Sequence, residues 1–434
     1  MSRDIKYIGK MFKKITLKNG IRLILSPKKE TEAVTCLVLF KVGSRYEPKN
    51  LNGISHFIEH MMFKGTKKRP STLAISKELD GVGAEYNAFT SKDHTGYYIK
   101  IYYKKIELAF DILSDMLMNS IFKNEEIIRE KNVIIEEINM YEDNPLMFIE
   151  ELFEKTLFGA HPLGRLISGE KENIKGLSRN KILDYLKKFY LPHGMLISVA
   201  GNFDVKKITK LVEKYFNLEP KKRRLPDFKE IRIEQNKPKL SVKFKETEQV
   251  QLCLGFSAYS YFHKNVYAQL ILAVILGGNM SSRLFINIRE RRGLAYFVKS
   301  GINIYQDTGA FVVQAGLDKK RIEEAIVAIW EELKKIKKEG VSGPELKKGK
   351  DFLEGKMVLE LEDSENIAAF LAKQELLVNK IETPQEKIKK INKVSKQDIQ
   401  RVAKNIIQHK KLTLALIGPF KEKKRFSDLI NKLK

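Results

Sequence analysis

An internal duplication constrains the fold of this chain more than any other feature. Residues 177–216 and 394–433 follow one pattern: a capped helix, a turn, an apolar strand that ends in glycine, and a second helix. Ser178 matches Ser395 at an offset of 217 residues, and the match continues without a gap. Because self-similarity at a fixed offset is the mark of a repeated structural unit, the sequence predicts one fold used twice.

The same offset extends beyond these segments and sets the predicted domain organisation. It pairs Cys36 with Cys253 in two apolar strand-like runs, VTCLVLF and VQLCLGF. Both cysteines are therefore interpreted as small buried hydrophobic residues. We predict an N-terminal domain over residues 1–218, an exposed linker over 219–239 and a homologous C-terminal domain over 240–434, since the linker begins without apolar periodicity.

The expected fold class is α+β, with two homologous sandwich domains that each pack helices on a mostly antiparallel sheet. Residues 15–26 alternate apolar and polar side chains around an Asn-Gly pair, which is a strong hairpin signal. Further strands are expected at 84–91 and 94–103. Helices are expected at residues 54–63, 72–79, 105–119, 125–141 and 147–158. Strands and helices segregate rather than alternate, so a parallel doubly wound sheet is the less favoured alternative.

Composition excludes several classes of protein. The chain has 434 residues, of which 43% are hydrophobic and 31% charged, so wholesale disorder is excluded. Two cysteines exclude a disulfide scaffold and a cysteine-based zinc cluster. The charged first residues do not resemble a secretory signal, and no apolar run approaches the roughly 20 residues of a membrane helix. We therefore expect a cytoplasmic protein without a membrane partner.

The net charge of +26 leaves several interpretations open. The 80 Lys and Arg against 54 Asp and Glu are compatible with a nucleic-acid partner, acidic substrates or solvated surfaces. No recognised nucleic-acid-binding module occurs, and the lysines are spread through both halves, so no nucleic-acid partner is expected.

The sharpest chemical feature is the run HFIEH at residues 56–60. On a helix, His56 and His60 lie one turn apart on the same face, close enough to bind one metal ion, with Glu59 beside them. The order H-x-x-E-H is the inverse of the common zinc-protease helix. Two ordinary helix histidines are the alternative interpretation of this motif taken alone.

A second acidic helix strengthens the metal hypothesis. Glu130 and Glu137 are seven residues apart, which is two helical turns, so both carboxylates lie on one face. Two histidines and one carboxylate would supply the three protein ligands of a catalytic zinc, and the other glutamate could hold a ligand histidine in place. The alternative is a solvated face of a charged helix.

Four motifs together resemble those of a known family. HFIEH followed by MMFKGT, then GAEYNAFTSKDHTGYY, REKNVIIEEI and, in the second half, GGNMSSRLFINIRERRGLAYFV resemble the pitrilysin/insulinase family of inverted zinc metallopeptidases. The chain is most similar to bacterial members that resemble the catalytic subunit of the mitochondrial processing peptidase. The motifs occur in both halves and in the family's order, so the resemblance spans the chain.

The resemblance implies a role for each residue of the N-terminal motifs. It places the zinc ligands on His56, His60 and Glu137, the general base on Glu59 and a supporting carboxylate on Glu130. An alanine and a glycine stand where the duplication would place the two histidines, so one zinc ion per chain is expected.

The resemblance also implies substrate contacts and an assembly. Arg289 and Tyr296 match residues that reach the active site from the second half, and Asn87 and Ala88 match the strand whose backbone pairs with substrate. Such peptidases enclose substrate in a chamber of four similar units, so a homodimer is implied.

The function expected from this resemblance is a zinc-dependent endopeptidase that cleaves short or unfolded peptides. A zinc-bound water, activated by the glutamate of HFIEH, would attack the peptide carbonyl. The alternative is a catalytically silent, peptide-binding partner subunit of a processing peptidase.

Overall fold

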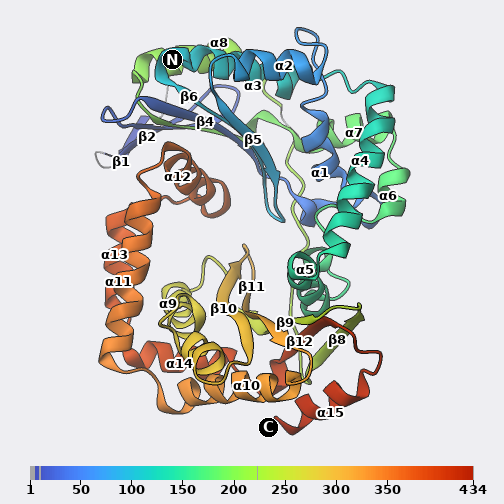
Figure 1. Ribbon diagram of the computed structural model, residues 1–434. Coiled ribbons are helices and arrows are strands. Elements are labelled where there is room, and N and C mark those ends of the chain that lie inside the picture. The colour runs from blue at the N-terminus through green and yellow to red at the C-terminus, as the bar shows by residue number, and fades with distance from the viewer. Residues whose placement is uncertain (1–4, 9–10, 222, 434) are drawn as a thin grey trace. The chain divides into compact units, whose positions relative to one another are not determined.

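The computed structural model describes residues 5–8, 11–221 and 223–433, which form two compact units (Figure 1). Unit 1 consists of Met1–Ile138, Leu166–Lys229 and Leu359–Thr383. Unit 2 consists of Asn139–Arg165, Glu230–Val358 and Pro384–Lys434. Each unit contains its own sheet and its own helices.

The sheet of unit 1 has seven strands, in the order β1-β2-β3-β7-β4-β6-β5. Their bounds are β1 Ile5–Ile8, β2 Phe12–Thr16, β3 Arg22–Pro27, β4 Ala33–Phe40, β5 Glu85–Thr90, β6 Thr95–Tyr102 and β7 Met195–Gly201. Strands β3 and β7 are parallel and the other neighbours are antiparallel. Strand β5 pairs only with β6, so it forms an edge of this sheet.

Helices cover both faces of this sheet. The helices of unit 1 are α1 Ile54–Met61, α2 Thr72–Asp80, α3 Ile106–Asn119, most of α4 Asn124–Asp143, α6 Lys171–Lys175, α7 Arg179–Phe189, α8 Val205–Tyr215 and α12 Ser364–Val378. Helix α12 packs against β4, β7 and β3, whereas α3 packs against β6 and β4 from the other face (Figure 1).

Unit 2 repeats this design with five strands, in the order β10-β11-β9-β12-β8. Their bounds are β8 Lys239–Phe244, β9 Gln249–Ala258, β10 Ala295–Ile304, β11 Gly309–Asp318 and β12 Thr413–Gly418. Its helices are α5 Pro145–Phe158, α9 Val266–Gly277, α10 Ile322–Glu339, most of α11 Gly343–Glu360, α13 Pro384–Lys393, α14 Lys396–Ile406 and α15 Lys424–Lys432.

The strand order shows that the duplication in the sequence is a duplication of the fold. The order β3-β7-β4-β6-β5 recurs as β8-β12-β9-β11-β10, including the single parallel pair. Helices α7 and α14 both begin after a serine N-cap, Ser178 and Ser395, whose side chain accepts a hydrogen bond from the first turn. The α+β class with mostly antiparallel sheets is confirmed.

The compact units are not contiguous in sequence, because each sheet is covered by a helix from the other half of the chain. Helix α12 packs on the sheet of unit 1, and α5 packs on the sheet of unit 2. On α12, the buried Glu375 carboxylate pairs with Lys14 and Arg22 at 2.6 and 3.1 Å. The division into residues 1–218, 219–239 and 240–434 therefore stays a prediction about the repeated sequence. The compact units are different, because each takes segments from both halves of the chain.

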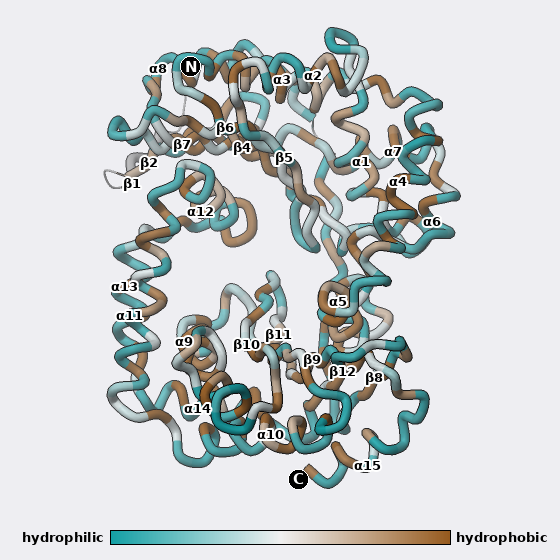
Figure 2. The backbone as a smooth tube through the Cα atoms, in the orientation of Figure 1, coloured by the Kyte–Doolittle hydropathy of each residue, from teal (hydrophilic) through white to brown (hydrophobic). Residues whose placement is uncertain are grey.

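In each unit a hydrophobic core lies between one face of the sheet and the helices that cover it. The helices alternate hydrophilic and hydrophobic residues along their turns, as expected of elements with one buried face (Figure 2). Cys36 and Cys253 are buried and free, and burial raises the pKa of both thiols. The described residues include no helix long and apolar enough to cross a membrane.

Candidate metal centre

Helix α1 carries the HFIEH motif and is fixed at its beginning by a buried carboxylate. Its apolar residues face the core, so the motif's polar side chains lie on the opposite face. Gly53, with φ of 99°, precedes the helix in a conformation that favours glycine. Glu47 accepts hydrogen bonds from the backbone N–H groups of Gly53 and Ser55 at 2.7 and 2.8 Å. These bonds satisfy donors that the first helical turn leaves unpaired.

Three side chains converge in unit 1 with the geometry of a metal site. His56 Nε2 and His60 Nε2 are 3.2 Å apart, and Glu137 Oε2 lies 3.7 and 3.6 Å from them. Tetrahedral zinc with bonds near 2.05 Å separates its ligand atoms by about 3.4 Å. Among the described residues, this is the group of three whose donor atoms lie close enough to share an ion.

Glu130 and Lys64 form a chain of contacts behind His60. Glu130 Oε1 lies 2.8 Å from His60 Nδ1, and Lys64 Nζ lies 2.6 Å from the other carboxylate oxygen. Burial acts to raise the pKa of Glu130, but the hydrogen bonds from His60 and Lys64 outweigh it and lower that pKa. With the proton assigned to Nδ1, His60 directs the lone pair of Nε2 toward His56 and Glu137.

Glu59 lies beside this group and is held by a threonine on the edge strand. Thr90 Oγ1 donates a hydrogen bond of 2.6 Å to Glu59 Oε2. Burial raises the pKa of Glu59, so its carboxylate is a stronger base than an exposed one. A carboxylate with this environment beside a metal site is suited to general base chemistry.

Burial and neighbouring charges shift the pKa values of the three converging residues. Burial, and after it the positive charge of His60, lower the pKa of His56 to about 3, so this imidazole is neutral, as a metal ligand must be. Burial acts to lower the pKa of His60, but the bond to Glu130 and the neighbouring carboxylates raise it. Burial raises the pKa of Glu137. The buried Nδ1 of His56 has no hydrogen-bond partner among the described residues.

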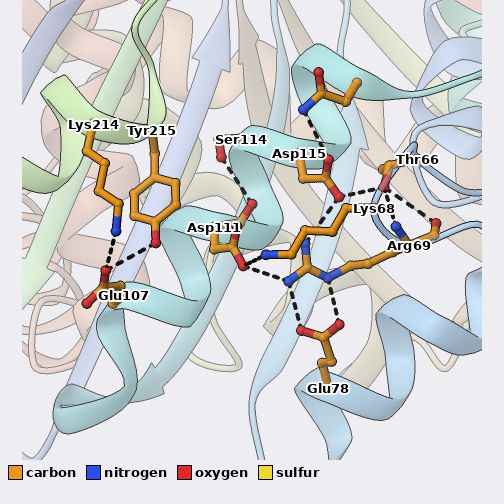
Figure 3. A network of polar contacts seen from close by, with 11 residues as sticks. Thr66, Lys68, Arg69, Glu78, Glu107, Asp111, Ser114, Asp115, Lys214 and Tyr215 are labelled. Atoms are coloured by element: carbon orange, nitrogen blue, oxygen red, sulfur yellow. Dashed lines mark hydrogen bonds and ion pairs between the residues drawn. The ribbon is translucent and has the colours of Figure 1, made fainter.

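A buried arginine fixes the loop that follows α1. Arg69 is 2% exposed and donates to Glu78, Asp111 and Asp115 at 2.8 to 3.1 Å (Figure 3). The hydroxyl of Thr66 in the same loop also donates to Asp115. The network ties the segment that carries Lys64 to α2 and α3.

Three contributors to the site were missed by sequence reasoning. Thr90 contacts Glu59 of the motif. Glu47 contacts the backbone at the beginning of α1, and Lys64 pairs with Glu130 behind His60. Lys64 and Thr90 lie inside the quoted runs MMFKGT and GAEYNAFTSKDHTGYY, which was the available signal. Nothing in the local sequence pairs Glu47 with α1, because that contact depends on the turn between them.

Arg289 and Tyr296 lie together in unit 2. Arg289 lies in the π-helical turn Phe285–Glu290, and its guanidinium carbon lies 4.7 Å from the Phe285 ring and 6.0 Å from the Tyr296 ring. Tyr296 is 72% exposed and stands at a bulge near the start of β10. π-turns and bulges often reorient functional side chains. That both residues act on the metal centre stays a prediction.

Asn87 and Ala88 lie in the middle of the edge strand β5, opposite Tyr98 and Tyr97 of β6. The outer side of β5 pairs with no other strand of the described sheet. Its outer backbone groups are therefore available to an added strand, except that the Ala88 N–H donates to Asn87 Oδ1 at 2.9 Å.

The fold and this arrangement define a class of protein, the inverted zinc metallopeptidases with an H-x-x-E-H helix. Residues 22–171 match the family described as Insulinase (Peptidase family M16), and residues 176–353 match the Peptidase M16 inactive domain. The chain is 37% identical to the "Uncharacterized zinc protease YmxG" of Bacillus subtilis, over 94% of this chain and 98% of that protein. It is 32% identical to an uncharacterized zinc protease of Streptomyces coelicolor, over 95% and 90% of the two chains.

Solved structures show the same architecture over nearly the whole chain. A protease from Helicobacter pylori superposes with a TM-score of 0.88 at 25% identity, covering 94% of this chain and 99% of that one. A peptidase M16 inactive domain from Pseudomonas fluorescens superposes at 0.85 with 17% identity, covering 97% and 98%, which shows the fold alone. The chain belongs to the pitrilysin/insulinase family, peptidase family M16.

Proposed function

We propose that this protein is a zinc endopeptidase that cleaves short or unfolded peptides. The observation that carries the proposal is the convergence of His56, His60 and Glu137, with Glu59 next to them on the same helix as the histidines. The relatives named zinc proteases support the choice of metal.

The donor set fits zinc in number and kind. Two imidazole nitrogens and one carboxylate oxygen are the ligands of many catalytic zinc sites, which keep a fourth position open. His56, His60 and Glu137 would hold the ion, and the neutral state of His56 suits that role. Bound there, zinc would act as a Lewis acid on the substrate carbonyl and on the attacking water.

Glu59 has the position and basicity to move the proton. Its carboxylate accepts a proton from water as the water oxygen bonds to the peptide carbonyl carbon. It then donates that proton to the amide nitrogen as the C–N bond breaks. The hydrogen bond from Thr90 to Oε2 orients the carboxylate and leaves Oε1 to receive the proton.

Two further groups complete the proposed reaction. Arg289 and Tyr296 donate hydrogen bonds to the developing oxyanion, each worth about 3 kcal/mol when well placed. The substrate binds in an extended conformation along β5, where the backbone of Asn87 and Ala88 pairs with it.

We further propose a homodimer with one zinc ion per chain, in the cytoplasm. The dimer supplies the four similar units that enclose substrates in a chamber. One zinc per chain is supported by the duplication, which places no histidines at the corresponding positions of α9. Two zinc ions per chain in an elemental analysis contradict this part of the proposal.

Three glutamate variants test the site. Zinc content and cleavage of an unstructured peptide library, read by mass spectrometry, are compared for the parent, Glu59→Gln, Glu137→Gln and the exposed neighbour Glu136→Gln. We expect Glu59→Gln to retain zinc and lose at least about 100-fold in cleavage. Glu137→Gln should lose zinc, and Glu136→Gln should keep both properties. Equal cleavage by Glu59→Gln and the parent, or loss of zinc by Glu136→Gln alone, refutes the assignment.

A further inference from the structure

The two faces of the edge strand β5 meet different parts of unit 1. The Thr90 side chain points to α1, where it contacts Glu59. The Glu85 side chain points to the other face, where it pairs with Lys100 at 3.2 Å, and Lys100 pairs with Asp363 before α12 at 2.8 Å. Because strand side chains alternate between faces, the odd-numbered residues of β5 lie on the α12 side.

Phe89 forms the floor of this α12 side. It pairs in register with Gly96 of β6, and a Cβ atom on Gly96 would lie 2.4 Å from Phe89 Cζ and 2.7 Å from Leu39 Cδ2. The ring therefore lies inward across β6, over the space that the missing side chain leaves. It does not extend past the edge of the sheet, so the outer backbone of β5 stays accessible.

Lys373 of α12 lies above this floor. Its ammonium nitrogen is 5.7 Å from the centre of the Phe89 ring, and the His94 ring contacts Phe89 edge-on at 5.7 Å. Burial, and after it the charge of Lys373, lower the pKa of His94 to about 3, so His94 is neutral. Lys373 thus supplies the positive charge at this end of β5.

Lys373 differs from the other lysines on this face in having no counter-ion. Lys14 pairs with Glu375, and Lys100 pairs with Glu85 and Asp363. Among the described residues, no carboxylate lies within ion-pair distance of Lys373, which is exposed to solvent along part of its length. Partial burial of its ammonium lowers the pKa of Lys373 from its ordinary value. An unpaired cation over an aromatic floor, beside an open strand edge, is suited to receive a carboxylate.

We propose that Lys373 is a specificity-determining residue, which selects peptides with an Asp or Glu side chain beside Phe89. This inference rests on the proposed function, in which an extended peptide pairs with β5. Every second side chain of that peptide lies on the α12 side. The acidic side chain lies over Phe89 and bonds to the Lys373 ammonium.

The preference applies to one position of the peptide. Glu85 lies four residues before Phe89, which is about 13 Å along the strand. Glu85 and Glu365 place negative charge toward that end, and Lys100 neutralises part of it. An acidic peptide side chain near Glu85 therefore gains no comparable electrostatic attraction.

Cleavage of a peptide library by charge-reversal variants tests the proposal. When the peptides that the parent cleaves are aligned on the cleaved bond, one position should be enriched in Asp and Glu. At that position, kcat/KM should be about fivefold higher for Glu than for Gln, which is the effect of one partly exposed ion pair. Lys373→Glu should reverse the preference at that position toward Lys and Arg. Lys210→Glu, the same charge change on the exposed face of α8, should leave it unchanged. An unchanged preference in Lys373→Glu overturns the proposal.

Binding separates this inference from the proposed function. Affinities of matched Glu, Gln and Lys peptides are measured by fluorescence anisotropy for Glu59→Gln and for Glu59→Gln with Lys373→Glu. A Glu preference that inverts with Lys373→Glu supports the proposal even where the parent cleaves no peptide, a result that would refute only the peptidase assignment. Equal affinity for the three peptides refutes the role of Lys373.

Discussion

Replacement of Glu130 by glutamine tests whether the contacts behind His60 control zinc affinity. The amide side chain keeps the size of the original one and an oxygen for His60 Nδ1–H, but it removes the negative charge. The present bond of 2.8 Å joins a buried carboxylate, 3% exposed, to the imidazole. Only the charge of this contact changes, so the folded structure should persist.

The magnitude follows from the two kinds of hydrogen bond. A bond to a charged group contributes about 1.5–3 kcal/mol and a neutral bond about 0.5–1.5 kcal/mol. The middle values of the two ranges differ by about 1.25 kcal/mol, which corresponds to a loss of zinc affinity of roughly tenfold. This value lies at the lower end of the 10- to 100-fold losses, roughly, that follow removal of groups behind a metal ligand. Lys64 adds little, because its partly exposed end can turn to water.

The assay is zinc competition with a fluorescent chelator, with folding checked by circular dichroism. Glu136→Gln, the same substitution on an exposed position of α4, is the matched control and should bind zinc as the parent does. A folded Glu130→Gln protein whose zinc affinity stays within about twofold of the parent would falsify the orienting role of Glu130.

Three further predictions concern stability. Burial raises the pKa of Glu47 from 4.5 to about 7. The folded state therefore binds the Glu47 proton more tightly than the unfolded chain does. The free energy of unfolding should fall by about 3 kcal/mol as the pH rises from below the unfolded pKa to above the folded one. Glu47→Gln should flatten the pH dependence of the melting temperature; an unchanged slope contradicts this. Arg69→Met removes the ion pair of the buried Asp115 carboxylate and should lower the free energy of unfolding by about 3–5 kcal/mol. Arg129→Met, at an exposed position, should lower it by under about 0.5 kcal/mol. Both are measured by urea denaturation, and equal losses would contradict the network. Gly96→Ala should cost about 1–3 kcal/mol because its Cβ meets an aromatic ring, and Gly301→Ala, with open space, should cost less; the reverse order would refute this packing.

Much of the architecture was predictable because it depends on local sequence patterns. The expected helix at 54–63 corresponds to α1 Ile54–Met61, and the expected strand at 94–103 corresponds to β6 Thr95–Tyr102. Periodicity, capping residues and the 217-residue offset act over short stretches or by direct comparison, so they need no knowledge of packing. They were sufficient for the fold class and for its duplication.

The exchange of helices was not predictable in the same way. Helices α5 and α12 occupy corresponding places in the repeat, and each has an ordinary amphipathic sequence. Which sheet a helix covers depends on the path of the chain between them and on contacts such as Glu375 with Arg22, 353 residues apart. Local sequence carries no signal for a pairing of that range.

The metal centre was likewise predictable only in part. The sequence by itself determined that two histidines and a glutamate lie close together on a short helix, because helical spacing alone brings them together. Only the tertiary structure decided that α4 lies against that helix, with Glu137 toward both imidazoles and Glu130 toward His60. The tertiary fold likewise placed Lys64, Thr90 and the edge strand around the motif, because these contacts join segments whose separation in the sequence carries no periodicity.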